Sequence, residues 1–285
     1  MKHRHRILIA WTVLFLLTVG LWWRVWRSRN PVDTLDGGNR GRVASQATPD
    51  GEYRTTALLA YEPFDYEAHE ALVSQNGGTG FHTPWDPGGF NARLFDVFNM
   101  QPGALTYPGL ATRGTNHLSG AAPPEGVTAI AGVGRFLSNN LAVPGAKYFL
   151  SFLHRTDGEE EYASIVLGSG QGKELSVGKS GSVKQYHISQ RGGVGRVYSG
   201  VEPVVGKTVF IVVKMEFMDG PDRFTLYLNP TPGNPEPLTG AVKDDLDLEL
   251  ADQLFLYSRG AWSVDEIRLG TTWEAVTPAG DVPSP

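Results

Sequence analysis

Apolar residues are distributed in two different ways along this chain. From Ile7 to Trp26 they form one nearly continuous run (ILIAWTVLFLLTVGLWWRVW), in which the first charged residue is Arg24. A helix needs about 20 apolar residues to cross a bilayer, so this run predicts a transmembrane helix. Beyond residue 55, apolar and polar residues alternate in short segments separated by glycine-rich turns, a pattern typical of β-strands.

The clearest alternation predicts a β-hairpin at residues 207–217 and 223–229, joined by a turn that contains Asp219 and Gly220. The residues expected to face the core are Val209, Ile211, Val213, Met215, Phe217, Phe224, Leu226 and Leu228. Residues 147–155 and 162–168 predict a second hairpin. Further strands are predicted at 57–61, 127–131, 174–178, 184–190, 253–258 and 262–269. Such a series predicts an all-β fold, an antiparallel two-sheet jelly-roll sandwich.

The chain is predicted to have five parts. Residues 1–6 form a short basic tail, 7–26 a transmembrane helix, 27–54 a flexible linker, 55–278 the sandwich and 279–285 a disordered tail. The linker prediction rests on composition, because residues 28–52 contain no aromatic and few aliphatic side chains. Such a segment cannot bury enough apolar surface to offset the entropy lost on ordering.

Three interpretations of the N-terminal run stay open: a retained signal anchor, a cleaved signal peptide and a buried helix. The basic start (Lys2, Arg4, Arg6) suits the first two. The bulky residues from Trp22 to Arg27 replace the small ones of a cleavage site and favour the anchor. Although basic residues flank both sides, we expect a single-pass membrane protein with a cytoplasmic N terminus. Its C-terminal domain would be extracytoplasmic, either periplasmic or at the cell surface.

Composition limits the chemistry that is open to this chain of 285 residues. It contains no cysteine, which excludes disulfides, thiol nucleophiles and thiolate metal sites. Its formal net charge of -5 provides no basic field for nucleic acid, so nucleic acid is not an expected partner. The 35 glycines agree with a fold that contains many turns.

Five segments carry a family resemblance. They are residues 58–66 (LLAYEPFDY), 77–81 (GGTGF) with Trp85, 107–110 (YPGL), 148–153 (YFLSFL) and 264–273 (VDEIRLGTTW). In this order they resemble the concanavalin A-like, LamG-like jelly-roll domains of surface and membrane proteins of the planctomycete type. The resemblance covers about Thr55 to Pro278. It implies a lectin- or glucanase-type sandwich, in which binding of glycans or proteins is commoner than catalysis, and it names no ligand.

A candidate ligand-binding segment lies between residues 81 and 91. It combines aromatic and polar side chains in a turn-rich stretch: Phe81, His82, Trp85, Asp86 and Asn91. Sugars stack their apolar faces on aromatic rings, while Asp and Asn side chains bond to the hydroxyl groups. The alternative is that Phe81 and Trp85 pack in the core.

A candidate calcium site involves Glu62, Asp65 and Asp265. The first and last strands of a jelly roll are often neighbours, so these carboxylates could converge as hard oxygen ligands. Related sandwich domains hold a structural Ca²⁺ in such a place, which is an argument by analogy. The alternative is ordinary hydrogen bonding and ion pairing with Arg268 or Arg223. No other cofactor is expected.

The leading functional hypothesis is a membrane-anchored, non-catalytic recognition module that binds carbohydrate. A second hypothesis is a structural or adhesion protein that binds an envelope protein. A third is a glycoside-active enzyme, which would need two carboxylates facing each other across a cleft. The Glu-x-Asp-x-x-Glu pattern of laminarinases is absent from the chain, so we do not expect an enzyme. A lectin would instead show an accessible aromatic platform.

Overall fold

The computed structural model describes residues 45–47, 53–55, 57–87, 97–121, 130–158, 162–180 and 183–280. The chain divides into two units, Met1–Thr55 and Thr56–Pro285. In the first unit, β1 (Ser45–Ala47) pairs antiparallel with β2 (Tyr53–Thr55). The predicted membrane segment, 7–26, lies outside the described residues. Among the residues that are described, no helix combines the length and apolarity needed to span a bilayer.

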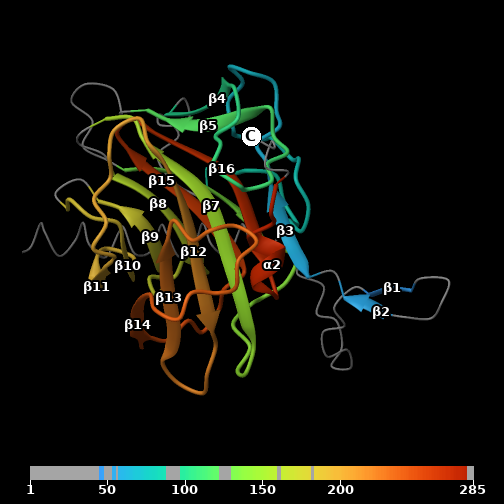
Figure 1. Cartoon of the computed structure of the whole chain (residues 1–285), viewed down its shortest axis with the longest axis vertical. Helices are drawn as coiled ribbons and strands as arrows, with labels where there is room; N and C mark the ends of the chain where they lie inside the picture. The colour runs from blue at the N-terminus through green and yellow to red at the C-terminus, as the bar shows by residue number, and fades with distance from the viewer. Residues whose placement is uncertain are drawn as a thin grey trace, which may run out of the picture. The chain divides into compact units, whose positions relative to one another are not determined.

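The second unit is an antiparallel sandwich of two sheets (Figure 1). The larger sheet has the order β14 (Ala241–Leu246), β13 (Asp222–Leu228), β12 (Thr208–Glu216), β7 (Lys147–Thr156), β16 (Trp262–Gly270), β5 (Asn116–Gly120), β4 (Phe98–Pro102), with β3 (Leu58–Glu62) also paired to β16. The smaller sheet has the order β11 (Val194–Tyr198), β10 (His187–Gln190), β9 (Leu175–Lys179), β8 (Tyr162–Gly168), β15 (Gln253–Arg259), β6 (Ala131–Phe136). The predicted all-β, two-sheet class is confirmed.

One predicted hairpin is confirmed and the other is wrong. β12 pairs with β13 from Ile211↔Leu228 to Glu216↔Arg223. The strands predicted at 147–155 and 162–168 exist, but β7 lies between β12 and β16 whereas β8 lies between β15 and β9. β7 is apolar on both faces, so it is buried on both sides as a central strand of the larger sheet. After β7 the chain crosses to the smaller sheet, where it forms β8.

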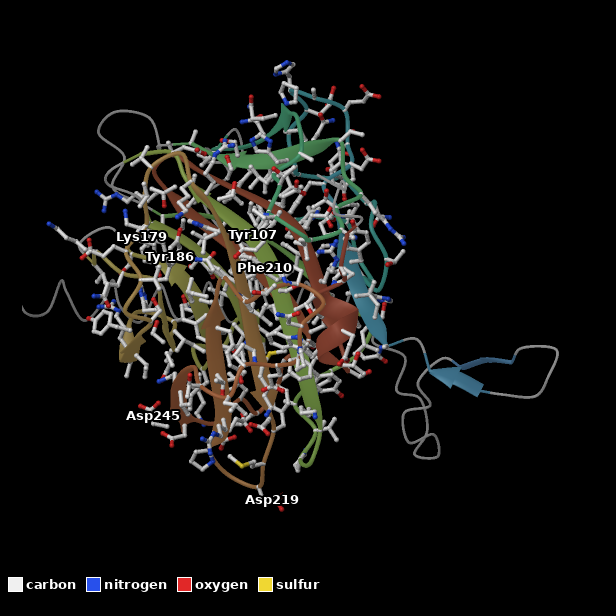
Figure 2. All side chains as sticks on the ribbon, viewed as in Figure 1. Tyr107, Lys179, Tyr186, Phe210, Asp219 and Asp245 are labelled. Carbon is white, nitrogen blue, oxygen red and sulfur yellow. The ribbon has the colours of Figure 1, made fainter. Side chains whose placement is uncertain are left out.

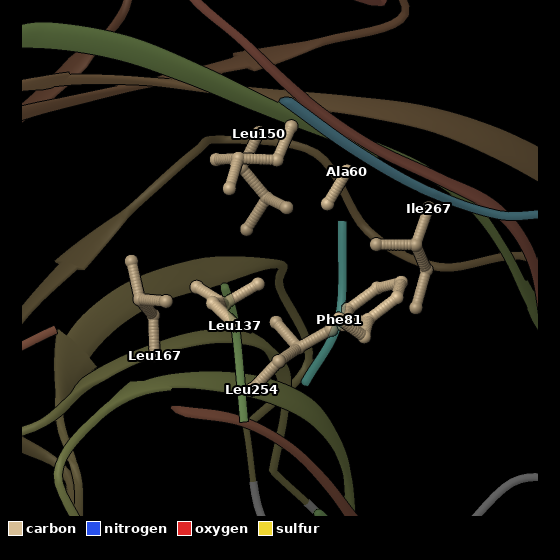
Figure 3. A pocket seen from close by; sticks show the side chains of 8 residues that line it. Ala60, Phe81, Leu137, Leu150, Leu167, Leu254 and Ile267 are labelled. Atoms are coloured by element: carbon tan, nitrogen blue, oxygen red, sulfur yellow. The ribbon is translucent and has the colours of Figure 1, made fainter. Parts of the chain in front are cut away.

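The main core lies between the two sheets and consists of alternate residues of the strands. The residues predicted to face inward from β12 do so, and Trp262 and Trp85 are fully buried there. A small cavity of about 10 Å³ remains in this core, lined by Leu150, Leu254 and Ile267 among other apolar side chains (Figure 3). With no polar group to bond a water molecule, such a gap stays dry and is a packing defect.

A second apolar cluster covers the opposite side of the larger sheet, which we call the outer face. Residues 103–115, here called the strap, cross this face and place Leu105, Tyr107 and Leu110 over β7 and β12. Tyr107 packs on Phe210 with ring centroids 5.4 Å apart (Figure 2). The short helix α2 (Trp273–Val276) packs against β16 and β7 beside the strap. These contacts remove much of the outer face from solvent.

The C-terminal end of the domain is fixed to the strap. Ala279 forms an isolated bridge with Leu110, and the Gly280 N–H donates to the Gly109 carbonyl at 2.9 Å. Residues 279 and 280 were predicted to belong to the disordered tail, but in the structure they pair with the strap. The rest of that tail, residues 281–285, lies outside the described residues.

β16 changes its neighbour halfway along its length. Its first part pairs with β5 (Trp262↔Gly120) and its last part with β3 (Leu269↔Ala60), with an irregularity between Asp265 and Arg268. At this fork Glu266 has a φ of 54°, a left-handed conformation that is unfavourable for residues other than glycine. The irregularity directs both Asp265 and Glu266 into buried positions beneath the strap.

Candidate functional site

Glu62 joins the two sheets through a buried ion pair. Its carboxylate receives the Arg135 guanidinium at 2.8 Å, and neither side chain is more than 1% exposed. The Trp85 indole N–H donates to the same oxygen, Oε2, at 3.0 Å, and the Tyr66 hydroxyl donates to it at 2.8 Å. The second oxygen, Oε1, accepts the Phe64 N–H at 3.0 Å. Glu62 is therefore the centre of a polar network inside the sandwich.

The predicted ligand-binding segment contributes to that network. Trp85 is 1% exposed, and Arg135 stacks over the Phe81 ring at 4.0 Å from its centroid. His82 and Asp86 are exposed, whereas Asn91 lies outside the described residues. The structure thus brings Phe81 and Trp85 together as interior packing, which was the alternative interpretation. Ligand binding by this set stays a prediction, and Trp85 offers no open ring face for it.

The three predicted calcium ligands do not meet in one shell. β3 and β16 are neighbours, as expected, but the Glu62 carboxylate is bonded to Arg135 between the sheets. Asp65 is exposed and accepts the Thr115 hydroxyl at 2.6 Å, while Asp265 accepts the Leu105 N–H at 2.9 Å under the strap. Within the described ranges, no group of three His, Asp or Glu side chains is arranged to hold a metal ion. Calcium binding stays a prediction.

Asp265 and Glu266 form a buried carboxyl pair on the outer face. Burial and the neighbouring Glu266 carboxylate raise the pKa of Asp265 to about 8. Glu266 accepts the Arg113 N–H at 2.6 Å and the Tyr61 hydroxyl at 2.7 Å, and it pairs with Arg268. Neither carboxyl group is accessible, and both hold the strap. Their arrangement is that of a structural pair buried beneath the strap.

The raised pKa of Asp265 predicts a loss of stability in mild alkali. The folded chain keeps this proton at pH values where the unfolded chain, with an ordinary pKa of 3.8, has lost it. This contribution is fully present below pH 3.8 and is lost as the pH rises to 8. Between pH 6.5 and 8 we expect this Asp265 contribution to the free energy of unfolding, measured with urea as the difference between the parent chain and a variant without the carboxyl group, to fall by about 2 kcal/mol.

The variant Asp265→Asn tests the origin of this fall, because it replaces the neutral acid by a neutral amide. We expect its free energy of unfolding to show no fall from pH 6.5 to 8. His154 and His187 act in the opposite direction, because desolvation lowers their pKa values from 6.5 to about 3 and about 4. In the unfolded chain each ring is half-protonated at pH 6.5, and losing that proton by pH 8 raises the free energy of unfolding by about 0.4 kcal/mol per residue. A variant as pH-sensitive as the parent chain would assign the fall to another group.

Beyond the strap, polar side chains cross the outer face in one line. The strand registers place them side by side on five neighbouring strands, and we call this line the polar row: Asn99, Ser119, Ser263, Arg155 and Thr208. With strands about 4.8 Å apart, the row spans about 19 Å. Ser263 is buried, and the other four side chains are half-buried, so they retain contact with solvent.

Arg155 is the charged residue of the polar row. Its Nε donates to Asp157 at 2.5 Å, and one of its terminal nitrogens, Nη2, donates to the Ser263 hydroxyl at 3.1 Å. Ser263 in turn donates to the other Asp157 oxygen at 2.5 Å. The same Arg155 nitrogen lies 3.5 Å from His117 Nε2. Desolvation lowers the pKa of His117 and favours the neutral ring.

This arrangement offers donors and acceptors at fixed positions on a rigid sheet. Guanidinium and carboxylate groups form charge-assisted hydrogen bonds, and hydroxyl and amide side chains flank them along the row. The cluster lacks a serine–histidine contact, since Ser263 donates to Asp157 and His117 Nδ1 donates to the Gly103 carbonyl. The row therefore presents hydrogen-bonding groups that are chemically complementary to a ligand rich in hydroxyl groups.

Comparisons with known proteins identify no family. No protein-family model and no curated protein matches the chain. Among solved structures, domain 4 of an extracellular arabinanase from Geobacillus stearothermophilus, solved with arabinotriose, is 13% identical with a TM-score of 0.43, covering 77% of this chain and 96% of that one. An endo-1,3-beta-glucanase from Streptomyces sioyaensis is 8% identical with a TM-score of 0.41, covering 68% and 97%.

A mutant sialidase of Trypanosoma rangeli is 13% identical with a TM-score of 0.39. The match covers 82% of this chain but 35% of that one, so the chain spans about a third of the sialidase. All three TM-scores are below 0.5, and no assignment of activity or ligand rests on them. The functional argument depends on the side chains of the outer face.

Proposed function

We propose that the sandwich is a non-catalytic recognition module that binds a saccharide along the polar row. The observation that carries this proposal is the line of five polar side chains across neighbouring strands, which includes Arg155 and its ion pair with Asp157. A sheet surface that served only packing would be apolar there, as it is under the strap. Instead, its donors and acceptors lie at half-buried positions, where partial desolvation strengthens hydrogen bonds to a ligand.

The length of the row supports an extended ligand. A line of about 19 Å on a rigid sheet can contact several units of an oligosaccharide at once. The apolar run at residues 7–26 supports the further proposal that the module is anchored in a membrane with the sandwich outside the cytoplasm. A domain in that position would meet polysaccharides of the cell envelope or the surroundings. The family resemblance of the sequence points in the same direction.

Arg155→Ala tests the proposal, because it removes the charged donor of the row. We expect saccharide binding, measured on a glycan array and then by calorimetry with the best oligosaccharide, to weaken about 10- to 100-fold, the range for losing hydrogen bonds to a charged group. The side chains of Arg155 and Asp157 are each about a quarter exposed. Loss of their ion pair should therefore cost at most about 1 kcal/mol of stability.

The matched control is Arg223→Ala on the larger sheet. Arg223 lies in β13 outside the polar row, and its side chain is exposed. This variant should bind saccharide as the parent chain does. Equal binding by Arg155→Ala and the parent would remove the polar row from consideration, and equal loss in both arginine variants would indicate a nonspecific effect of charge.

A further inference from the structure

The polar row contains one full positive charge, and the fold neutralises it locally. Asp157 approaches the Arg155 guanidinium with both carboxylate oxygens, Oδ1 at 2.5 Å from Nε and Oδ2 at 3.5 Å from Nη2. Ser263 donates to Oδ2 and fixes the carboxylate in this orientation. The pair is 28% and 24% exposed, so both charges face the space where a ligand would lie.

The other titratable side chain of the cluster adds no charge at neutral pH. His117 donates from Nδ1 to the Gly103 carbonyl, so its Nε2 is left as an acceptor that faces Arg155. Burial is the largest cause that favours the neutral ring, and the nearby Arg155 charge acts in the same direction. Asn99, Ser119, Ser263 and Thr208 are neutral. The five residues of the row, taken together with Asp157 and His117, therefore carry no net charge near pH 7.

We infer that Asp157 is the specificity-determining residue of the row and makes it select neutral saccharides over acidic ones. This inference rests on the proposed saccharide-binding function. A hydroxyl group can donate to Asp157 and accept from Arg155, so a neutral sugar uses both members of the pair. A ligand carboxylate that approaches Arg155 also meets the like charge of Asp157 a few ångströms away, and the repulsion offsets the attraction.

The rigidity of the pair explains why an acidic ligand does not simply displace Asp157. Asp157 is fixed by its backbone as well as its side chain, since its N–H donates to the Ala261 carbonyl at 2.9 Å. Arg155 is fixed by Ser263 on the neighbouring strand. The ion pair is thus part of the sheet surface, and discrimination follows from a repulsive group built into the site.

The test compares neutral and acidic polysaccharides that share a backbone. The probes are hydroxyethyl cellulose against carboxymethyl cellulose, curdlan against carboxymethyl-curdlan, and methyl-esterified against de-esterified pectin, each titrated with the 285-residue chain at two salt concentrations. We expect the chain to bind the neutral member of a pair at least tenfold more tightly. Asp157→Asn should reduce this ratio about tenfold or more by raising affinity for the acidic member, with the gain weakening at high salt.

Two further variants separate charge from geometry. Asp157→Glu keeps the charge and should keep the neutral preference. Ser263→Ala removes a hydroxyl without changing the charge. It should weaken binding of the neutral and the acidic polysaccharide about equally and leave the ratio of the two affinities unchanged. Folding of every variant is checked by thermal unfolding, and Asp157→Glu supplies the comparison if Asp157→Asn unfolds.

The outcomes distinguish the inference from the function on which it depends. Binding without discrimination by the parent chain, or an unchanged ratio in Asp157→Asn, would overturn the inference and leave saccharide binding intact. A ratio that also collapses in Asp157→Glu would assign selectivity to geometry and overturn the role of charge. Failure of the parent chain to bind any probe or array glycan would overturn both proposals.

Discussion

Replacing Glu62 with alanine is expected to destabilise the sandwich by about 3–5 kcal/mol, because it leaves the Arg135 charge buried without its anionic partner. Arg135 remains in contact with the Thr83 and Gly77 carbonyls at 3.1 Å, and these neutral acceptors only partly offset the loss. The Trp85 indole N–H and the Tyr66 hydroxyl also lose their common acceptor. Urea unfolding of the purified 285-residue chain measures the change.

A double-mutant cycle shows whether the ion pair itself causes this effect. Arg135→Met removes the charge and retains an apolar stem beside Phe81, so Glu62→Ala with Arg135→Met should be less destabilised than the sum of the single variants. The control is Glu249→Ala, which breaks an exposed ion pair with Lys173 and should leave the unfolding midpoint unchanged. Strict additivity within the cycle would show that the buried pair is not coupled.

Local sequence pattern was sufficient to predict most strands and the fold class. Alternation at residues 207–217 indicated both the strand and its buried face, because one row of its side chains packs between the sheets. The pairing of 147–155 with 162–168 was wrong because proximity in sequence favoured a hairpin. The polar turn between them gave no sign that the chain changes sheets there.

The polar row could not have been predicted from one sequence. Its five residues come from five strands and are related by register alone. β4, which supplies Asn99, alternates over only four residues, and β5, which supplies Ser119, lacks a clear alternating pattern. Isolated Ser, Thr and Asn residues resemble ordinary surface positions. The only available signal was the paired Arg155 and Asp157 at the end of a strongly apolar strand, where two charges flank one residue.

The site residues predicted from the sequence show how a structural residue can be mistaken for a functional one. Glu62, Trp85 and Asp265 were selected because a carboxylate or an indole in a turn-rich sequence is chemically conspicuous, and all three are buried at structural junctions. Glu62 and Arg135 are 73 positions apart, so the neutralising partner was not visible in the sequence. Buried polar groups need such partners, and residues that satisfy them can look like functional sites when read locally.

Glu266→Ala is expected to destabilise the chain by about 3–5 kcal/mol, because this carboxylate holds three separate parts of the outer face together. It accepts the Gly114 N–H of the strap at 3.1 Å and the Tyr61 hydroxyl of β3 at 2.7 Å. It also pairs with Arg268, whose side chain is buried. Without it, the Arg268 guanidinium keeps one hydrogen-bond acceptor among the described residues, the Ala111 carbonyl at 2.6 Å.

Glu266→Gly gives this prediction a sharper form. The glycine variant lacks the same carboxylate, but glycine adopts the φ of 54° without the conformational penalty that alanine incurs at this position. We therefore expect Glu266→Gly to be more stable than Glu266→Ala by about 1 kcal/mol, although glycine is normally the less stable choice within a strand. Hydrogen exchange should show faster exchange at the strap amides of Arg113 and Gly114 in both variants. If alanine proved the more stable substitute, the left-handed fork at Glu266, and with it this account of how the strap is held, would be wrong.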